Sequence, residues 1–250
     1  MPRATTIQNV LEQLDAIISE SITTNSRMGL FAYVYRRTTA EIAAEIEKGS
    51  FEDNQRLEIM DVAFANLYLD AYHAYKNNKP ISAVWAYAFN QTKEPLTILQ
   101  HILLGMNAHI NLDLAIATAT TMAGKEIKNI EADFNKVNDI LYQITNELQD
   151  RLSSVSPLMF LLDLIGKNSD EKIIDFSMRK AREQSWNSAN LLWALGNNMD
   201  ANAIKKIDLI VLKLSKIIKD PNSKIIHYAL RLMHTFETKQ VSTIIKKLQA

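Results

Sequence analysis

One apolar stretch that also carries polar side chains most constrains how this chain can fold. Residues 101–117 read HILLGMNAHINLDLAIA, which is apolar on nearly every side of a helix. A helix that is hydrophobic all round is a buried helix, so we expect this segment at the centre of the fold. Buried imidazoles, amides and carboxylates are costly unless each has a partner. The polar residues of the stretch therefore form either a satisfied polar core or a functional site.

The spacing of these polar residues places them on two sides of the predicted helix. One side carries, in steps of four, His101, Gly105, His109 and Asp113. His109 and Asp113 are thus neighbours one turn apart. Asn107 and Asn111 form a second pair on roughly the opposite side. Because glycine weakens a helix interior, we expect Gly105 to admit a neighbouring backbone or a ligand.

The rest of the chain has the spacing of amphipathic helices. Apolar residues recur at steps of three and four over residues 7–22, 30–49, 55–76, 80–90, 130–152 and 173–195, and in two last helices divided at Asp220. A further apolar segment runs from Ser156 to Gly166, and Ser169 and Asp170 are candidate caps in the turn after it. We find no internal repeat and no long linker. We therefore expect one all-α domain over residues 1–250, a multi-helix bundle around a buried central helix from about Pro95 to Ala123.

Composition narrows the class of protein. The 250-residue chain has only 6 Gly and 5 Pro, which are too few for a many-stranded sheet. Its 28 basic and 28 acidic residues balance, so no overall field favours nucleic acid. The lack of cysteine excludes disulfides, thiolate zinc sites and cysteine nucleophiles. With neither a signal peptide nor a charge-free apolar run of about 18 residues, we expect a cytoplasmic protein without a membrane span. The oligomeric state stays open.

The segment after residue 200 differs from the rest in charge, because ten Lys and Arg side chains outnumber the acidic ones there. They are Lys205, Lys206, Lys213, Lys216, Lys219, Lys224, Arg231, Lys239, Lys246 and Lys247. This basic region could contact phosphates or anionic lipid. The alternative is a solvated face that balances an acidic remainder.

Several blocks of the chain resemble, in order, a widespread bacterial family known only as a domain of unknown function. These blocks are FEDNQRLEIMDVAFANLYLDAY, Trp85 with Phe89, LLGMNAHINLDLA, DFNKVNDIL, SPLMFLLD and FSMRKAREQSWNSA. The resemblance covers about residues 29–195 and implies no activity. The polar positions typical of that family are here Asp61, Tyr68, Asp70, Trp85, His101, Asn107, His109, Asn111, Asp113, Asp133, Asn138, Arg182 and Trp186.

A shorter pattern resembles zinc-dependent phospholipase C and the related nucleases, which are all-helical and of similar length. Their LGxxxHxxxD helix matches Leu104, Gly105, His109 and Asp113, and the resemblance implies that the last two ligate a metal ion. The chain departs from that family at Ala117 and Ala119, where Pro and His are usual, and has no further histidine-rich set.

A metal site would need more ligands than this one turn supplies. A divalent ion takes three or four donors at about 2.0–2.2 Å. His109 and Asp113 give two, and Asp61 or Asp70 on another helix is the best supplier of a third, since His101 lies two turns away. A bound ion with an open position would activate water for hydrolysis. The alternative is that protein partners hold His109 and Asp113 and nothing binds.

Two hypotheses for function remain. In the first, the chain is an enzyme for a small or lipid-like molecule in an interhelical pocket. Its catalytic residues are His101, His109 and Asp113, acting through a divalent metal or through acid/base chemistry of His109. The candidate ligand-binding residues are Asp61, Tyr68, Trp85, Asn107, Asn111, Arg182 and Trp186. In the second, the chain is a non-catalytic ligand-binding or scaffold protein whose polar cluster fixes helix register.

Overall fold

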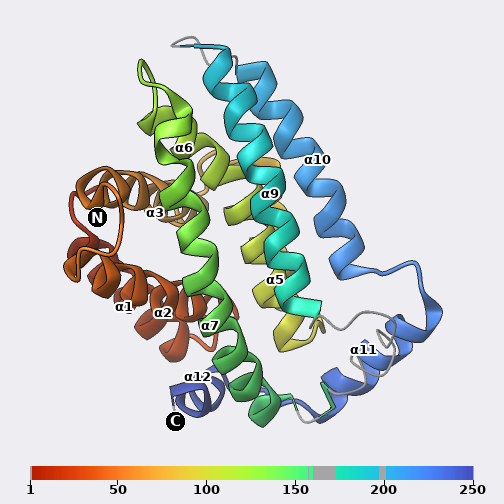
Figure 1. The fold of residues 1–250 in the computed structure, drawn as a ribbon. Helices are drawn as coiled ribbons and strands as arrows, with labels where there is room; N and C mark the ends of the chain where they lie inside the picture. Colours follow the sequence, from red (N-terminus) through yellow and green to blue (C-terminus); the bar gives the residue numbers. More distant parts are fainter. Residues whose placement is uncertain (1, 157, 160–172, 197–200, 250) are drawn as a thin grey trace.

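The fold is an assembly of helices, shown as a ribbon in Figure 1. The structure is a computed structural model that describes residues 2–156, 158–159, 173–196 and 201–249. Within these ranges every regular element is a helix and no strand occurs, which confirms the all-α prediction. One hydrophobic cluster extends from Ala4 near the N-terminus to Leu248 near the C-terminus.

The helices follow the predicted segments closely. Before the central helix lie α1 (Ile7–Thr23), α2 (Met28–Glu47), α3 (Asn54–Lys76), α4 (Ala83–Asn90) and the short 3-10 turn η1 (Gln91–Lys93). The central helix is built from α5 (Ile98–Ala108), the π-helical turn η2 (His109–Asp113) and α6 (Leu114–Thr121). After it come η3 (Ile127–Ile130), α7 (Glu131–Val155), α9 (Ile173–Ala194), α10 (Ala201–Lys219), α11 (Lys224–Phe236) and α12 (Val241–Gln249).

The central helix is surrounded by helices from both halves of the chain. It contacts α2, α3 and α4 from the N-terminal half and α9 and α10 from the C-terminal half. By length and composition it could cross a membrane, but 89% of its most apolar window is buried inside the protein. It is therefore the core helix that the apolar stretch predicts.

The central helix begins later than the sequence indicates. Pro95 was the predicted start, but the first helical residue is Ile98 and Thr97 is the N-cap. The Thr97 side chain accepts from the backbone N–H of Gln100, and the Gln100 side chain accepts from that of Thr97. This reciprocal capping box satisfies two N–H groups that have no partner inside the helix, which fixes the start at this point.

Three helix starts are completed by buried carboxylates from distant parts of the chain. Asp133 of α7 accepts from two backbone amides just before α3, and Asp208 of α10 accepts from the first two amides of α4. Glu237, which follows α11, accepts from the first amide of α5. The donor–acceptor distances are 2.7–3.2 Å. Because a helix N-terminus carries unpaired N–H groups and a positive dipole end, these acids fasten the outer helices to the core.

The C-terminal region has three helices where the sequence predicted two. The predicted break at Asp220 separates α10 from α11, and a second break after Phe236 separates α11 from α12. Glu237 adopts an extended backbone there, and its carboxylate reaches the start of α5. The predicted apolar segment from Ser156 to Gly166 lies mostly, and the caps Ser169 and Asp170 lie wholly, outside the described residues.

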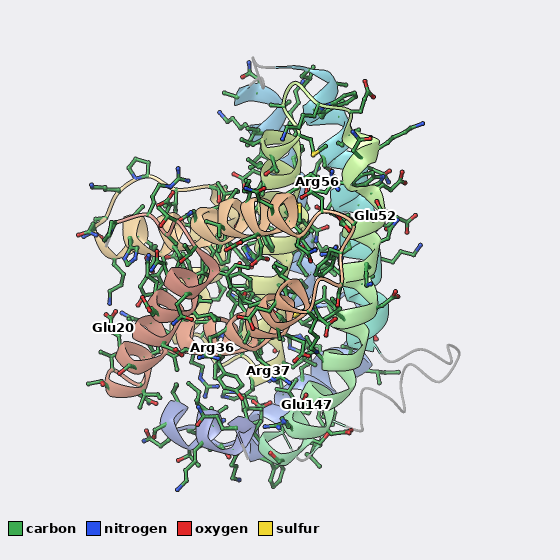
Figure 2. All side chains as sticks on the ribbon, turned by 60° about the vertical axis from the view of Figure 1, so that its left-hand side comes forward. Glu20, Arg36, Arg37, Glu52, Arg56 and Glu147 are labelled. Carbon is green, nitrogen blue, oxygen red and sulfur yellow. The ribbon has the colours of Figure 1, made fainter. Side chains whose placement is uncertain are left out.

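Charged side chains link helices at the surface, as in the contact between α2 and α7 (Figure 2). Arg37 of α2 contacts Glu41 at 2.8 Å and Glu147 of α7 at 3.1 Å. All three side chains are partly exposed, so each pair contributes less than about 1 kcal/mol. The contact between Arg37 and Glu147 links α2 to α7. Both helices contribute residues to the wall of the cavity described below.

Candidate functional site

A hydrogen-bonded chain of three buried side chains lies at the middle of the central helix. The Nδ1 atom of His109 is 3.0 Å from Oδ2 of Asp113, and the indole Nε1 of Trp85 donates to the same oxygen at 2.9 Å. His109, Asp113 and Trp85 are only 2–3% exposed. Asp113 therefore fixes the orientation of the imidazole, and Trp85 of α4 fixes the orientation of Asp113.

The backbone around this chain is a π-helical turn. The N–H of Leu114 donates to the carbonyl oxygen of His109, five residues earlier, where an α-helix would bond four residues earlier. The wider turn brings side chains four residues apart more nearly above one another than an α-helix does. Single π-turns inside α-helices are frequent at functional sites. Regular 3.6-residue spacing predicted the His109 and Asp113 contact but not this distortion.

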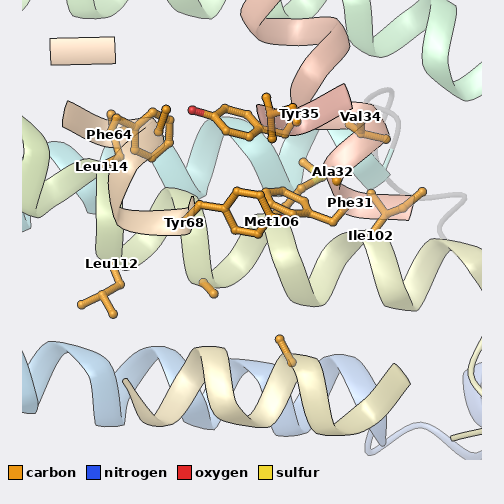
Figure 3. Close-up of a cluster of buried hydrophobic side chains, with 14 of the residues drawn as sticks. Phe31, Ala32, Val34, Tyr35, Phe64, Tyr68, Ile102, Met106, Leu112 and Leu114 are labelled. Atoms are coloured by element: carbon orange, nitrogen blue, oxygen red, sulfur yellow. The ribbon is translucent and has the colours of Figure 1, made fainter. Parts of the chain in front are cut away.

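Aromatic rings enclose the imidazole of His109. The ring of Phe64 stacks on it, with centroids 3.6 Å apart and planes 8° apart, and Tyr35 meets it edge-on at 4.3 Å. Phe31 also approaches edge-on, at 5.6 Å. Figure 3 shows these aromatic side chains of α2 and α3 above the central helix. Within the described residues the Nε2 atom of His109 is buried and has no hydrogen-bond partner.

Burial sets the charge state of the pair. It lowers the pKa of His109 well below the usual value and raises the pKa of Asp113 well above its usual value, although the Trp85 N–H lowers the latter. Both shifts favour an uncharged pair. In one tautomer of that pair, Oδ2 of Asp113 carries the proton and donates it to Nδ1 of His109. The second nitrogen, Nε2, then keeps its hydrogen and is a donor without an acceptor.

A cavity of about 80 Å³ adjoins His109. Its wall is almost wholly apolar and comes from α2, α3, α5, α7 and α9, with Leu99, Ile102, Met106, Val137 and Leu152 among its members. The polar exceptions include His109, Asp61 and Arg182. One buried water needs about 10–15 Å³ and an engineered apolar cavity of about 150 Å³ holds benzene, so this space is large enough for a molecule of a few heavy atoms.

Asp61 and Arg182 form the second polar part of the cavity wall. Burial raises the pKa of Asp61 to about 7, although Arg182 lowers it, and Oδ2 of Asp61 has no hydrogen-bond partner in the described ranges. Arg182 donates to the carbonyl of Phe134 at 2.7 Å and to the side chain of Asn138, and its guanidinium lies over the Phe134 ring at 4.4 Å. Burial lowers the pKa of Arg182 to about 9. The predicted ligand-binding residues Asp61 and Arg182 thus face the same cavity as His109.

The predicted Asn pair lies on the other side of the central helix and has protein partners. Asn107 donates to the backbone oxygen of Val211 at 3.0 Å and to Oγ of Ser215 at 2.8 Å. Asn111 donates to the side-chain oxygen of Asn107 at 3.0 Å. These contacts join the central helix to α10, and neither Asn lines the cavity. Their geometry is that of a structural connection.

Three other predicted site residues surround the cavity without lining it. Tyr68 is fully buried against Phe31 and Trp85, and burial raises its pKa. Trp85 acts through Asp113, as described above. Trp186 packs on the ring of Phe134, at 5.0 Å between centroids, and so supports the stack on which Arg182 rests.

His101 lies apart from the His109 pair, in a smaller cavity of about 20 Å³. This cavity is also lined by Arg27 and Gly105. Burial, with a smaller effect of Arg27, lowers the pKa of His101 to about 3. The close neighbour of Gly105 is the side chain of Phe31, where a backbone or ligand was expected. An added Cβ would lie 2.4 Å from Cγ of Phe31.

The donor set for a metal ion is incomplete in the described part of the chain. No group of three or more His, Asp or Glu side chains there could hold an ion. His109 and Asp113 are in contact, but Asp61 does not join them, and Asp70 is an exposed partner of Arg3 at 3.1 Å. The described residues therefore do not fit the three- or four-ligand site that the metal hypothesis requires.

Sequence reasoning missed the aromatic wall of the site. Phe31, Tyr35 and Phe64 recur at helical spacing on α2 and α3, and this pattern reads as ordinary core. The signal that could have identified them is the glycine in the helix opposite, because Gly105 leaves the space that Phe31 fills.

The chain is thus an all-helical protein with a buried His–Asp pair beside an apolar cavity. Comparison with known proteins shows the family to which it belongs. A family model described as a family of unknown function, DUF5995, matches residues 7–221. The chain therefore belongs to this family. No curated protein and no solved structure matches it, so the likeness to zinc-dependent phospholipase C has no support from these comparisons.

Proposed function

We propose that this chain binds a small, mostly apolar molecule with one hydrogen-bond acceptor in the cavity beside His109, and that His109 and Asp113 donate a proton to that acceptor. The observation that carries the proposal is the buried Nε2 of His109, which has no partner among the described residues and belongs to a side chain that lines the cavity. A buried polar atom without a partner costs about 1–3 kcal/mol, so a ligand that accepts from Nε2 is favoured.

The proton transfer follows from the order of the hydrogen bonds. The Nε2–H of His109 is given to the acceptor, and the proton on Asp113 Oδ2 moves to Nδ1 of the same ring. The imidazole stays neutral, the protonated acceptor carries the positive charge, and the Asp113 carboxylate carries the negative charge. The N–H of Trp85 is already directed at that oxygen and stabilises the carboxylate. Phe64 and Tyr35 keep the ring in this orientation.

A second candidate is ligand binding without proton transfer. It is favoured by the raised pKa of Asp113, since the proton transfer would leave a charged carboxylate in buried surroundings. In this case Nε2–H is a fixed donor that selects ligands with a carbonyl or ether oxygen. The lipid-like ligand of the first hypothesis fits either candidate only through a short apolar end, given the cavity of about 80 Å³.

The two candidates separate in an experiment with butanone, which has one carbonyl oxygen and few heavy atoms. Binding to the full-length protein is followed by the nitrogen chemical shifts of the His109 imidazole. Proton transfer to the carbonyl oxygen makes the protons on the adjacent carbon more acidic, and water then removes one of them to give the enol. The transfer is therefore followed by deuterium uptake at that carbon in heavy water. We expect butanone to shift the Nε2 signal and the protein to accelerate deuterium uptake, and both effects to disappear in His109→Phe. The matched control is His227→Phe, because His227 is exposed on α11.

Each outcome has one meaning. Binding without accelerated deuterium uptake supports the second candidate and contradicts proton transfer. Xenon, an apolar probe, should enter the same cavity in both wild type and His109→Phe. If butanone leaves the His109 signals unchanged while the protein is folded, the proposed function is wrong.

A further inference from the structure

Exposed apolar side chains are concentrated in the C-terminal part of the described chain. Of its eleven large exposed hydrophobic residues, only Ile22 and Ile59 lie before residue 190. The other nine are Leu191, Leu195, Leu209, Ile210, Leu214, Ile217, Ile225, Tyr228 and Phe236. Four of them belong to α10, which lies at the outer edge of the molecule with α9 beside it (Figure 1). Because exposed apolar side chains that lie together can mark an interaction site, we consider how those of α10 are arranged.

The exposed face of α10 combines an apolar stripe with lysines. Ile210, Leu214 and Ile217 recur at steps of four and three, so they lie along one line of the helix, with exposed fractions of 62%, 43% and 49%. Lys206 lies four residues before Ile210 and Lys213 three residues after it, so both lie on the same side of the helix as the stripe. We call Lys206, Ile210, Lys213, Leu214 and Ile217 the α10 face.

No acidic side chain of α10 offsets these lysines. The one acidic residue of the helix, Asp208, is buried and accepts from the two backbone amides at the start of α4. Lys219 is paired with Glu94 at 3.7 Å, but among the described residues Lys206 and Lys213 have no acidic partner. The α10 face is therefore both apolar and positively charged, although the whole chain has zero net charge.

The charge of the α10 face indicates which partner fits it. A second copy of the chain would bring the same lysines together across a two-fold axis, with no acid on the face to balance them. Nucleic acid would satisfy the lysines but leave the aliphatic stripe in water. An anionic bilayer surface satisfies both, since aliphatic side chains enter the headgroup boundary while lysines contact the phosphates.

We propose that the α10 face binds anionic membrane surfaces. This site is separate from the cavity beside His109, and the proposal does not depend on the proposed function. It gives the basic region of the sequence a definite partner, and it limits the contact to one helix. The aliphatic residues supply apolar contact, and the lysines supply selectivity for negatively charged lipid.

Co-sedimentation of the full-length protein with vesicles tests the proposal. One set of vesicles contains equal parts of phosphatidylglycerol and phosphatidylcholine, and the other contains phosphatidylcholine alone. We expect binding to the first set only, and weaker binding as salt is raised. The double variant K206E/K213E should bind at least about tenfold more weakly, because each lysine near an anionic surface contributes several-fold in affinity. I210S/I217S should also bind more weakly.

Matched controls use the same substitutions on other faces. K246E/K247E makes the same charge change on α12, and Ile59→Ser removes an isoleucine of 55% exposure on α3. Both should bind like wild type. Equal loss in K246E/K247E and K206E/K213E would mean that only net charge matters, and full binding by I210S/I217S would mean that the stripe makes no contact. A dimer of the wild type that I210S/I217S abolishes, without vesicle binding, would assign the face to a second copy. Each of these three results overturns the proposal.

Discussion

The two sides of the central helix contain similar polar pairs in opposite situations. Asn107 and Asn111 on one side and His109 and Asp113 on the other are each four residues apart, and all four side chains are 5% exposed or less. Helix α10 completes the hydrogen bonds of the Asn pair, because it supplies a carbonyl and a hydroxyl as acceptors. The His–Asp pair faces α2, α3 and a cavity, and in the part of the chain that the structure describes Nε2 has no partner.

This difference shows that burial alone does not identify a functional site. Both pairs are polar, buried and regularly spaced, and both lie in the same apolar stretch. What separates them is whether the surrounding helices complete their hydrogen bonds. A completed pair stabilises one helix arrangement, whereas an incomplete pair next to a cavity keeps an atom available for a ligand. Four measurements test this contrast.

The largest loss of stability is expected for Asn107→Ala, on the side of the central helix that contacts α10. This change removes one hydrogen bond each from the Val211 carbonyl, the Ser215 hydroxyl and the Asn111 amide. At about 1 kcal/mol for each group and a similar cost for the cavity, the free energy of unfolding should fall by about 4 kcal/mol. Urea unfolding measures the loss. Asn111→Ala removes only one of these hydrogen bonds and is the control. An equal loss in both variants would contradict the view that Asn107 joins the central helix to α10.

On the cavity side of the central helix, the buried carboxyl of Asp61 should make the free energy of unfolding depend on pH. Its folded pKa of about 7 lies above the ordinary value of 3.8, so the folded state holds a proton that the unfolded chain has released. Stability should therefore fall as pH rises from about 4 to about 7, by roughly 3 kcal/mol, and then level off.

Asp61→Asn should remove this part of the pH dependence, because the amide stays neutral throughout. Urea unfolding at several pH values gives the difference between variant and wild type, in which the titration of other groups cancels. Asp70→Asn is the control, since Asp70 is exposed and paired with Arg3. Parallel curves for wild type and Asp61→Asn would show that Asp61 ionises normally, and the cavity wall would then be more polar than described.

A smaller effect is expected at Gly105, which lines the smaller cavity and packs on Phe31. The new Cβ of Gly105→Ala would lie within 2.4–2.7 Å of three Phe31 atoms, so the ring must move. Overpacking of this kind costs about 2 kcal/mol. The same movement should change the His109 signals in a nitrogen spectrum, because Phe31 contacts that ring. A variant that is as stable as wild type, with unchanged His109 signals, would show that the aromatic wall is loosely packed.

The smallest effect on stability is expected for His109→Phe. The new ring keeps the stack on Phe64 and removes the partnerless Nε2, but it loses the contact with Asp113. These changes oppose one another, so the free energy of unfolding should change by less than about 1 kcal/mol. The comparison with Asn107→Ala is direct. A loss as large as in that variant would make His109 structural, and the contrast between the two sides would fail.

The elements of the fold could be predicted because each depends on local spacing. The 3.6-residue recurrence of apolar side chains indicated most of the helices, and the unbroken apolar stretch indicated which helix is central. The errors fall at boundaries set by distant contacts. The central helix begins after its cap Thr97 and not at Pro95. The break that separates α11 from α12 follows Phe236, where the carboxylate of Glu237 accepts from the first amide of α5.

The candidate site was predicted only in part, for a related reason. Spacing alone brought His109 next to Asp113, since both lie on one helix. It could not predict the π-turn or the Trp85 contact, nor that Asn107 meets α10 while His109 meets a cavity. Those features depend on which helices pack on which side of the core. A sequence therefore determines the polar groups that its core helix buries, but only tertiary packing decides which of them are left with a hydrogen bond to make.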